Sequence, residues 1–237
     1  IRDNEDSHWW YLGRKALLHE LARRSDLSGG VVLDAGCGTG FAFRTLGPRG
    51  FSVQLDYSPD ALSFLDREDG VTAVRGSIVA LPFPDAAFDL VANMDVLEHV
   101  PDDALAVREI CRVLKPGGRA FITVPAYGWM SSVHDKALGH LRRYSFGQIQ
   151  GLLDSAGMEV EVCSGFVATL FPLAVVHRTV RNLFRTPVHE SDMSPVPQPL
   201  NSLFTRLMRR EARRVWKHPF PFGLTIVVLA RKPDPRE

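Results

Sequence analysis

The sequence has little cysteine, almost no excess charge of either sign, and no apolar run long enough to cross a membrane. The apolar stretch at residues 166–176 is interrupted by Pro172 and is too short to span a bilayer. Because 28 basic residues nearly balance 27 acidic ones, we expect no nucleic-acid surface formed by the whole molecule. The cysteines are odd in number and lack a metal-ligand spacing, which predicts reduced thiols, no metal site and a cytoplasmic location.

Apolar residues make up 45% of the 237-residue chain, which is enough for one α/β domain with decorations. Short apolar runs predict strands, and helical stretches alternate with them, as in a doubly wound parallel sheet. The predicted strands are residues 30–35, 51–56, 71–75, 88–93, 119–124, 158–164 and 224–230. The predicted helices are residues 7–25, 40–47, 59–67, 102–114, 145–156 and 201–217.

A glycine-rich turn follows the first predicted strand, in the segment VVLDAGCGTG at residues 31–40. Its glycines, Gly36, Gly38 and Gly40, permit positive φ and a close approach of a ligand to the main chain. The helix that begins near Phe41 points its N-terminal amides toward the same place. This pattern predicts a small-ligand site, for example for a nucleoside, at the carboxyl edge of the sheet.

Two acids favour S-adenosylmethionine over a dinucleotide at this turn. A dinucleotide fingerprint places its third glycine one position later than Gly40. Asp34 would repel a pyrophosphate, but its carboxylate suits an amino group and a sulfonium ion. Asp56 closes the second predicted strand, where a carboxylate can bind the two ribose hydroxyls.

At this point the chain resembles the class I S-adenosylmethionine-dependent methyltransferases, in particular the type-11 methyltransferase domain group. The resemblance covers roughly residues 30–125 and rests on several matched segments in the same order. These segments are LDAGCGTG (33–40), LPFPDAAFDLV (81–91), DVLEHVPDD (95–103) and EICRVLKPGG (109–118).

The resemblance implies a Rossmann-like, seven-stranded and mostly parallel sheet whose last strand is antiparallel. We expect residues 1–237 to form a single methyltransferase domain. Its parts are an N-terminal helical cover (1–28), a cofactor-binding core (30–165), a helical insertion (166–220) and the last strand (221–232).

Residues 166–220 are an insertion relative to the resembled fold. The predicted helix at 201–217 carries apolar side chains on one side and arginines largely on the other. Three interpretations stay open: packing on the domain, a lid over an apolar acceptor, or a peripheral membrane or homodimer contact.

The resemblance also assigns the cofactor residues. Asp34 is expected near the methionine amino group, and Asp56 on the ribose hydroxyls with Tyr57 beside the adenine. Where relatives carry Gly-Asp, this chain has Gly76-Ser77, so Ser77 and the backbone of Ile78 take the adenine side. The remaining expected contacts are Gly36, Cys37 and Gly38 from the loop, and Asn93 and Met94 after the fourth strand.

An aromatic cluster with an arginine stands near the start of the chain, in the segment HWWYLGR at residues 8–14. It resembles a leader helix that closes over the cofactor in part of this family. Trp10 could shelter the sulfonium, and Arg14 could bind the cofactor carboxylate. The alternative is a hydrophobic contact that fixes the helix to the core.

The acceptor side is expected after the fifth strand, where His, Arg and Tyr are dense. His134 and His140 are the candidate general bases, because imidazole titrates near neutral pH. The candidate substrate-binding residues are Tyr127, Trp129, Arg143 and Tyr144. A structural role for His140 and Arg143 stays open.

The sequence therefore predicts a methyltransferase that converts S-adenosylmethionine to S-adenosylhomocysteine. The methyl group would pass to an O, N or C atom of a small, partly apolar metabolite. Alternatives are an S-adenosylmethionine-binding protein with another or no activity, and an NAD(P)-dependent oxidoreductase. We expect a small-molecule acceptor, no nucleic acid partner and no transmembrane segment.

Overall fold

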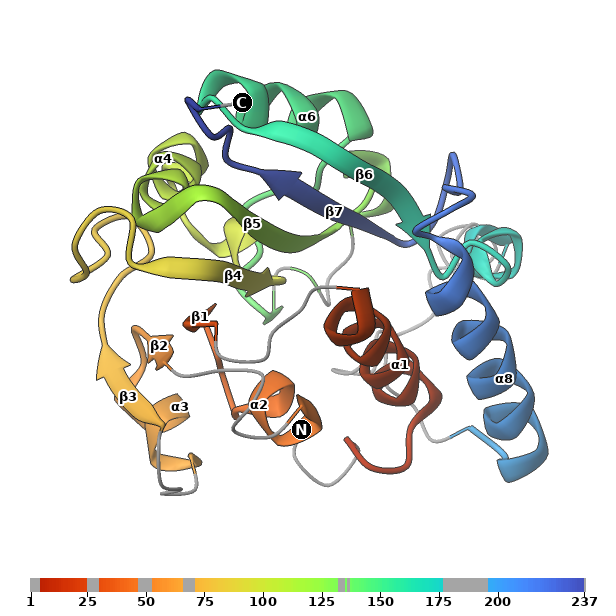
Figure 1. Ribbon diagram of the computed structural model, residues 1–237. Helices are drawn as coiled ribbons and strands as arrows, with labels where there is room; N and C mark the ends of the chain where they lie inside the picture. Colours follow the sequence, from red (N-terminus) through yellow and green to blue (C-terminus); the bar gives the residue numbers. More distant parts are fainter. Residues whose placement is uncertain are drawn as a thin grey trace.

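The computed structural model describes residues 5–24, 30–46, 53–65, 71–131, 135, 137–176 and 196–236. Its centre is a seven-stranded sheet with the strand order β3-β2-β1-β4-β5-β7-β6 (Figure 1). The first five strands are parallel, and β7 runs antiparallel to both of its neighbours. The expected seven-stranded, mostly parallel sheet with an antiparallel last strand is confirmed.

The central strands are apolar because both faces of the sheet are covered. All four residues of β1 and the first six of β7 are buried. The strands are β1 (Val32–Ala35), β2 (Val53–Asp56), β3 (Thr72–Arg75), β4 (Phe88–Met94), β5 (Leu114–Pro125), β6 (Glu159–Phe166) and β7 (Thr225–Arg231).

β5 begins five residues earlier than predicted. The sequence predicts a helix that ends at residue 114 and a strand that begins at residue 119, with Pro116-Gly117-Gly118 between them, yet Leu114 already pairs with Phe88. Gly117 adopts φ +76°, and the register shifts between Phe88 and Leu90. An irregularity of this kind lets a strand pass through a Pro-Gly segment without losing its pairing.

Helices cover both faces of the sheet. In Figure 1, α4 and α6 lie above the sheet, and α1, α2 and α8 lie below it. The helices are α1 (Trp9–Arg24), α2 (Phe41–Leu46), α3 (Pro59–Ser63), α4 (Asp103–Val113), α6 (Phe146–Ser155) and α8 (Gln198–Arg214). Three begin behind the caps Ser58, Asp102 and Ser145, each of which accepts a hydrogen bond from a backbone N–H in the first turn.

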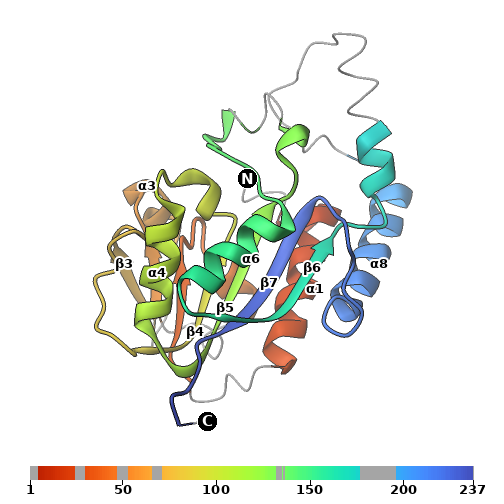
Figure 2. The same cartoon turned by 90° about the horizontal axis from the view of Figure 1, so that it is seen from above.

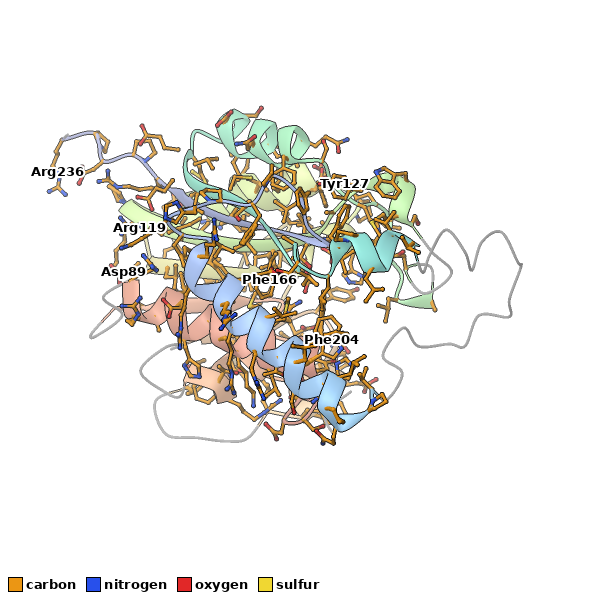
Figure 3. The ribbon with its side chains drawn as sticks, turned by 90° about the vertical axis from the view of Figure 1, so that its right-hand side faces the viewer. Asp89, Arg119, Tyr127, Phe166, Phe204 and Arg236 are labelled. Atoms are coloured by element: carbon orange, nitrogen blue, oxygen red, sulfur yellow. The ribbon has the colours of Figure 1, made fainter. Side chains whose placement is uncertain are left out.

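α8 packs its apolar side on α1 and on the sheet. Met208, Ala212 and Val215 are buried, whereas Arg209 and Arg213 are exposed. Phe204 meets the ring of Trp9 at 5.5 Å between centroids, and the two helices lie side by side (Figures 1 and 3). Packing on the domain, one of the three interpretations of the insertion, therefore holds for α8.

The contact between α1 and α8 is close at Gly13. A Cβ at that position would lie 2.8 Å from Met208 Cβ. The start of α1 is also fixed by Asn201, which accepts from Trp9 N at 2.8 Å and donates to the Ser7 carbonyl at 2.8 Å. Across the described ranges, no helix combines the length and apolar character needed to cross a membrane.

Candidate functional site

The glycine-rich loop crosses from the end of β1 toward β2. The N–H groups of Gly36 and Cys37 both donate to the Leu55 carbonyl, at 2.7 and 3.0 Å. Gly36 adopts φ +89°, and a Cβ there would collide with Val96. Gly38 adopts φ +54°, and a Cβ there would meet no atom within 4 Å. The loop thus presents open main chain at the carboxyl edge of the sheet.

Asp56 holds this loop in place at the end of β2. One carboxylate oxygen accepts from Gly38 N at 2.8 Å, and the other accepts from Ser58 N at 2.9 Å. A carboxylate has about four lone-pair sites, so Asp56 keeps acceptor capacity for hydroxyl groups. Tyr57, the expected adenine neighbour, is 73% exposed and offers an open ring face beside Asp56.

Asp34 is buried at the carboxyl end of β1, and its Oδ2 has no hydrogen-bond partner within the described part of the chain. Burial and, to a lesser degree, repulsion from Asp56 raise the pKa of Asp34 to about 7. On the neighbouring β4, Asn93 donates to the Ala35 carbonyl at 2.7 Å, and its Oδ1 likewise lacks a partner. An unsatisfied buried acceptor fits a hydrogen-bond donor from a ligand, and the Asp34 carboxylate suits a cationic one such as an ammonium group.

Three expected cofactor residues line one small cavity between α1 and the strand ends. Trp10, Arg14 and Met94 surround it together with Thr123, Phe166 and Thr225; Figure 3 shows Phe166 beside α8. Arg14 forms an ion pair with Asp95, which in turn accepts from Thr123 Oγ1 at 3.1 Å. Arg14 is therefore at the end of β4, and in this structure its partner is a protein carboxylate.

Asp95 stands in a backbone conformation that costs energy. Its φ is +55°, and its N–H donates to the Thr123 carbonyl at 2.9 Å. Tyr127, just beyond the end of β5, also has a positive φ of +59°. Such conformations in residues other than glycine concentrate at binding and catalytic sites. These two mark the carboxyl edge of β4 and β5.

The segment before α1 contacts the glycine loop directly. Glu5 accepts from Thr39 Oγ1 at 2.7 Å and forms an ion pair with Arg44 of α2. The rings of Tyr11 and Phe41 lie 5.5 Å apart. Trp9 and Trp10 serve different contacts, because Trp9 packs on Phe204 and Trp10 lines the cavity.

Ser77 and Ile78 stand in the turn after β3. Ala80 N donates to the Ser77 carbonyl at 3.1 Å, and Val79 N donates to Ser77 Oγ at 3.4 Å, so Ser77 is occupied by its own turn. Ile78 is buried in the core. Neither side chain lines the cavity of Trp10 and Arg14, and their expected place on the adenine side stays a prediction.

Tyr127 and Trp129 belong to an aromatic cluster at the carboxyl edge. Phe171 completes it, with ring centroids 5.4 Å from Tyr127, 6.4 Å from Trp129 and 5.7 Å from Phe222. Trp129 is 65% exposed. Figure 2 shows the segment after β5 and residues 168–176 at the same edge of the sheet, and Figure 3 labels Tyr127.

The other acceptor-side residues are bound to the protein. Tyr144 is buried, and its hydroxyl contacts Asp103 Oδ2 at 2.9 Å. Arg143 donates to Asp135 and to the Ala126 carbonyl. A structural role, left open for Arg143, fits these bonds, and His134 lies outside the described residues.

His140 is oriented by a carboxylate and joins a cluster that the sequence did not reveal. Its Nδ1 lies 3.0 Å from Asp135 Oδ1, and its ring meets that of His99 at 4.7 Å and 86°. Burial and the nearby His140 lower the pKa of His99. The buried carboxylate of Glu98 lies within 4.8 Å of both rings, measured between possible ligand atoms. Glu98 and His99 stand in the DVLEHVPDD segment, but only folding brings His140 to them.

The strand order, the glycine loop and the partly free carboxylates of Asp34 and Asp56 define a class I S-adenosylmethionine-dependent methyltransferase fold. Residues 33–122 match the family model of the methyltransferase domain. The chain thus contains a methyltransferase domain and is similar to S-adenosylmethionine-dependent methyltransferases.

Individual relatives agree with this assignment. A "Probable S-adenosylmethionine-dependent methyltransferase" of Mycolicibacterium smegmatis is 33% identical over 160 residues, which are 66% of this chain and 62% of the relative. A fatty-acid O-methyltransferase of the same species is 33% identical over 150 residues, 57% of this chain and 54% of that protein.

Among solved structures, the chain is similar to the methyltransferase in the complex with the Haloferax volcanii Trm112 methyltransferase activator. The identity is 25% and the TM-score is 0.61, with 98% of this chain and 92% of that chain covered. The chain thus aligns over its whole fold with a solved structure but spans only about three fifths of the length of the curated relatives it matches.

Proposed function

We propose that the chain transfers the methyl group of S-adenosylmethionine to an O, N or C atom of a small, partly apolar molecule. The observation that carries this proposal is the loop at the ends of β1 and β2. There the Gly38 N–H donates to Asp56, and Asp34 keeps a buried carboxylate oxygen without a hydrogen-bond partner in the described chain.

The residues present suit this cofactor group by group. Asp34 and Asn93 would accept hydrogen bonds from the amino group, and Asp56 would accept from the ribose hydroxyls. The open main chain at Gly38 allows close approach, and Tyr57 offers a ring face for the adenine. Arg14 would exchange part of its contact with Asp95 for the cofactor carboxylate, while Trp10 and Met94 enclose the methyl-bearing end.

The N-terminal segment would act as a cover over this site. Glu5 and Tyr11 bridge from α1 to the loop and to α2. Closing a site in this way excludes water from the reacting groups and aligns them, which can supply much of the rate. The bound cofactor supplies a sulfonium-activated methyl group, so the protein has mainly to position the acceptor.

The aromatic cluster of Tyr127, Trp129, Phe171 and Phe222 supports a partly apolar acceptor. Tyr127 and Trp129 follow β5, whose Thr123 lines the cavity, and Trp129 leaves most of its surface exposed. One relative is named a fatty-acid O-methyltransferase, which favours an apolar acceptor here as well. Where an acceptor must lose a proton, His140 held by Asp135 is the proposed base.

The first test is calorimetric titration with S-adenosylhomocysteine. We expect binding in the micromolar range and weaker binding of NAD. Asp56→Ala removes charge-assisted hydrogen bonds that are each worth about 1.5–3 kcal/mol, so the affinity should fall by roughly tenfold or more. Asp60→Ala, an exposed acid four residues further on, should leave it unchanged.

A second measurement separates a methyltransferase from a protein that only binds the cofactor. Metabolite extract is incubated with methyl-labelled cofactor, and labelled products are counted with the wild type and with Trp129→Ala. We expect labelled product, with a higher KM for the acceptor in Trp129→Ala and unchanged affinity for S-adenosylhomocysteine. Tight cofactor binding with no transfer to any extract fraction would point to a binding protein, and absence of cofactor binding would refute the proposal.

A further inference from the structure

Two segments meet beside the cavity and bring three metal-type ligands together. Glu98 and His99 lie in the helical turn η2 (Leu97–His99) that follows β4, and His140 lies in the segment after β5. One possible ligand atom from each residue lies within 4.8 Å of the others. The Leu141 N–H donates to the Glu98 carbonyl at 2.8 Å, so main-chain hydrogen bonding fixes the two segments to one another.

The buried carboxyl group of Glu98 lacks hydrogen bonds from the described residues, and a bound cation would compensate its charge. Its side chain is 0% exposed, and neither carboxylate oxygen has a hydrogen-bond partner in the described chain. Glu211 is also buried, but its oxygens accept from Ala168 N and Thr169 N at 2.9 and 2.6 Å. Burying a carboxylate without a hydrogen-bond partner costs free energy. Glu98 lacks the backbone hydrogen bonds that offset this cost at Glu211.

The nearby arginines do not fill this need. Arg14 is paired with Asp95, and Arg143 is paired with Asp135. Both guanidinium groups are close enough to influence Glu98 electrostatically, yet Arg14 donates to Asp95, and Arg143 donates to Asp135 and to the Ala126 carbonyl. Within the described residues, therefore, no cationic side chain donates a hydrogen bond to Glu98.

The two histidines are arranged as metal ligands are. Asp135 engages Nδ1 of His140 at 3.0 Å, which leaves Nε2 for a ligand. This carboxylate–histidine relay is the usual support behind a metal-bound imidazole, because it fixes the tautomer and the ring orientation. The Gly139 backbone holds the ring of His99 in a similar way. His99 is exposed, so the cluster is open on one side.

We propose that Glu98, His99 and His140 bind one divalent first-row transition metal ion, such as Zn²⁺ or Fe²⁺. Two imidazoles select such ions over Mg²⁺ and Ca²⁺, which prefer oxygen ligands. Three protein ligands leave coordination positions free, as in catalytic metal sites. The expectation of no metal site came from cysteine spacing and did not consider residues that only folding brings together.

The metal site narrows the acceptor to a hydroxyl compound, a step that rests on the proposed function. A hydroxyl oxygen bound to the metal loses its proton to water more readily, because the ion stabilises the oxyanion. That oxygen forms a bond to the methyl carbon while the carbon–sulfur bond of the sulfonium breaks. The sulfur keeps both electrons and leaves as a neutral thioether. His140 then coordinates the metal ion, and the ion, in place of a general base, promotes the loss of the hydroxyl proton.

The test titrates the full chain, stripped with EDTA and dialysed, with Co²⁺ or Zn²⁺ alone. We expect one Co²⁺ per chain with micromolar or tighter affinity, visible absorption bands of a low-coordinate Co²⁺ site, and displacement by Zn²⁺. Mg²⁺ should bind at least a hundredfold more weakly. Absence of saturable Co²⁺ and Zn²⁺ binding, or Mg²⁺ binding as tight as Co²⁺, would overturn the proposal.

Variants locate the site on this cluster. Glu98→Gln and His140→Gln should weaken Co²⁺ binding at least tenfold. His218→Gln, an exposed histidine elsewhere, and Glu211→Gln, a buried glutamate elsewhere in the fold, should not. The wild-type melting temperature should rise on adding Zn²⁺, and this reading does not depend on whether a variant folds. Equal Co²⁺ affinity in Glu98→Gln and the wild type would contradict the assignment.

The same protein separates this inference from the proposed function. S-adenosylhomocysteine is titrated into the EDTA-treated chain. Cofactor binding without metal binding refutes only the metal site, and metal binding without cofactor binding refutes the methyltransferase proposal while the metal site stands. Where both bind, methylation is also measured in EDTA. Undiminished methylation would refute the metal's role and would leave His140 as the proposed base that takes the acceptor's proton.

Discussion

Buried acceptors without partners gather at one edge of the sheet. Asp34, Asn93 and Glu98 all leave side-chain oxygens unsatisfied there within the described chain. Elsewhere a buried acid such as Glu211 is fully hydrogen-bonded. Because native proteins rarely leave such groups unpaired, these unsatisfied oxygens are the first candidates for contact with a ligand.

Asp34 should make the stability of the ligand-free protein depend on pH. Its pKa is about 7 in the folded chain, against about 3.9 in an unfolded one. Between these values the unfolded state releases its proton first, so the free energy of unfolding falls as pH rises from about 4 to 7. The stabilisation is fully present below pH 4 and lost above 7, and is on the order of 4 kcal/mol.

The measurement is urea unfolding of the wild type and Asp34→Asn at pH 4 to 8. Acids such as Asp89 and Glu109, whose pKa values are lowered by their cationic partners, respond in the opposite direction, but equally in both proteins. The variant should therefore gain stability relative to the wild type across this window. A difference that stays constant with pH would contradict the raised pKa of Asp34.

Residues of the site differ in how far the sequence could locate them. Asp34, Gly38 and Asp56 stand next to apolar runs, so local pattern alone put them at the sheet edge. Tyrosine is a residue type that often contacts substrates, and the sequence offered Tyr144 as a candidate for this reason. In the structure Tyr144 is buried against Asp103, and this burial depends on how two distant segments pack. The ligand cluster around Glu98 likewise exists only in three dimensions.

At the scale of elements, the junction of α1 and α8 depends on a glycine. A Cβ on Gly13 would lie 2.8 Å from Met208 Cβ and 3.0 Å from its Cγ, close to the backbone of α8 where little can yield. Gly13→Ala should therefore destabilise the protein by roughly 1–3 kcal/mol, as overpacking does. Gly151→Ala on α6, where a Cβ meets nothing within 4 Å, should instead stabilise by up to about 1 kcal/mol.

Thermal denaturation of both alanine variants checks this prediction. The two substitutions add the same atom to a helical glycine, so opposite signs isolate the packing against α8. If Gly13→Ala melts at or above the wild-type temperature, α1 and α8 are not held as closely as the structure indicates.

The predicted strands match the observed ones where burial leaves a clear pattern of apolar residues in the sequence. Parallel strands buried on both faces are short apolar runs, so β1, β4 and β7 were found within two residues of their bounds. The start of β5 was missed because Pro116-Gly117-Gly118 has the composition of a turn. A register shift opposite the segment, which no local pattern encodes, keeps it in the sheet.

At the scale of the whole molecule, α1 links the glycine loop to α8. Cofactor binding at the loop should therefore change the local stability of both helices. Glu5 contacts Thr39 and Arg44 on one side, and Trp9 N donates to Asn201 on the other. Cofactor bound at the loop would hold α1 and the start of α8 more firmly. This follows because opening either helix would then also disturb bonds that line the occupied site.

Hydrogen exchange with and without S-adenosylhomocysteine measures this coupling. Amides of α1 and of residues 198–205 should exchange more slowly with the ligand, by more than those of α6, which lies on the opposite face and serves as the internal reference. Glu5→Gln weakens the link to Arg44, so the extra protection should shrink in that variant while that of the glycine loop persists. Equal protection of α1 and α6 in the wild type would show that the N-terminal segment is no cover and that the cofactor acts only through global stability.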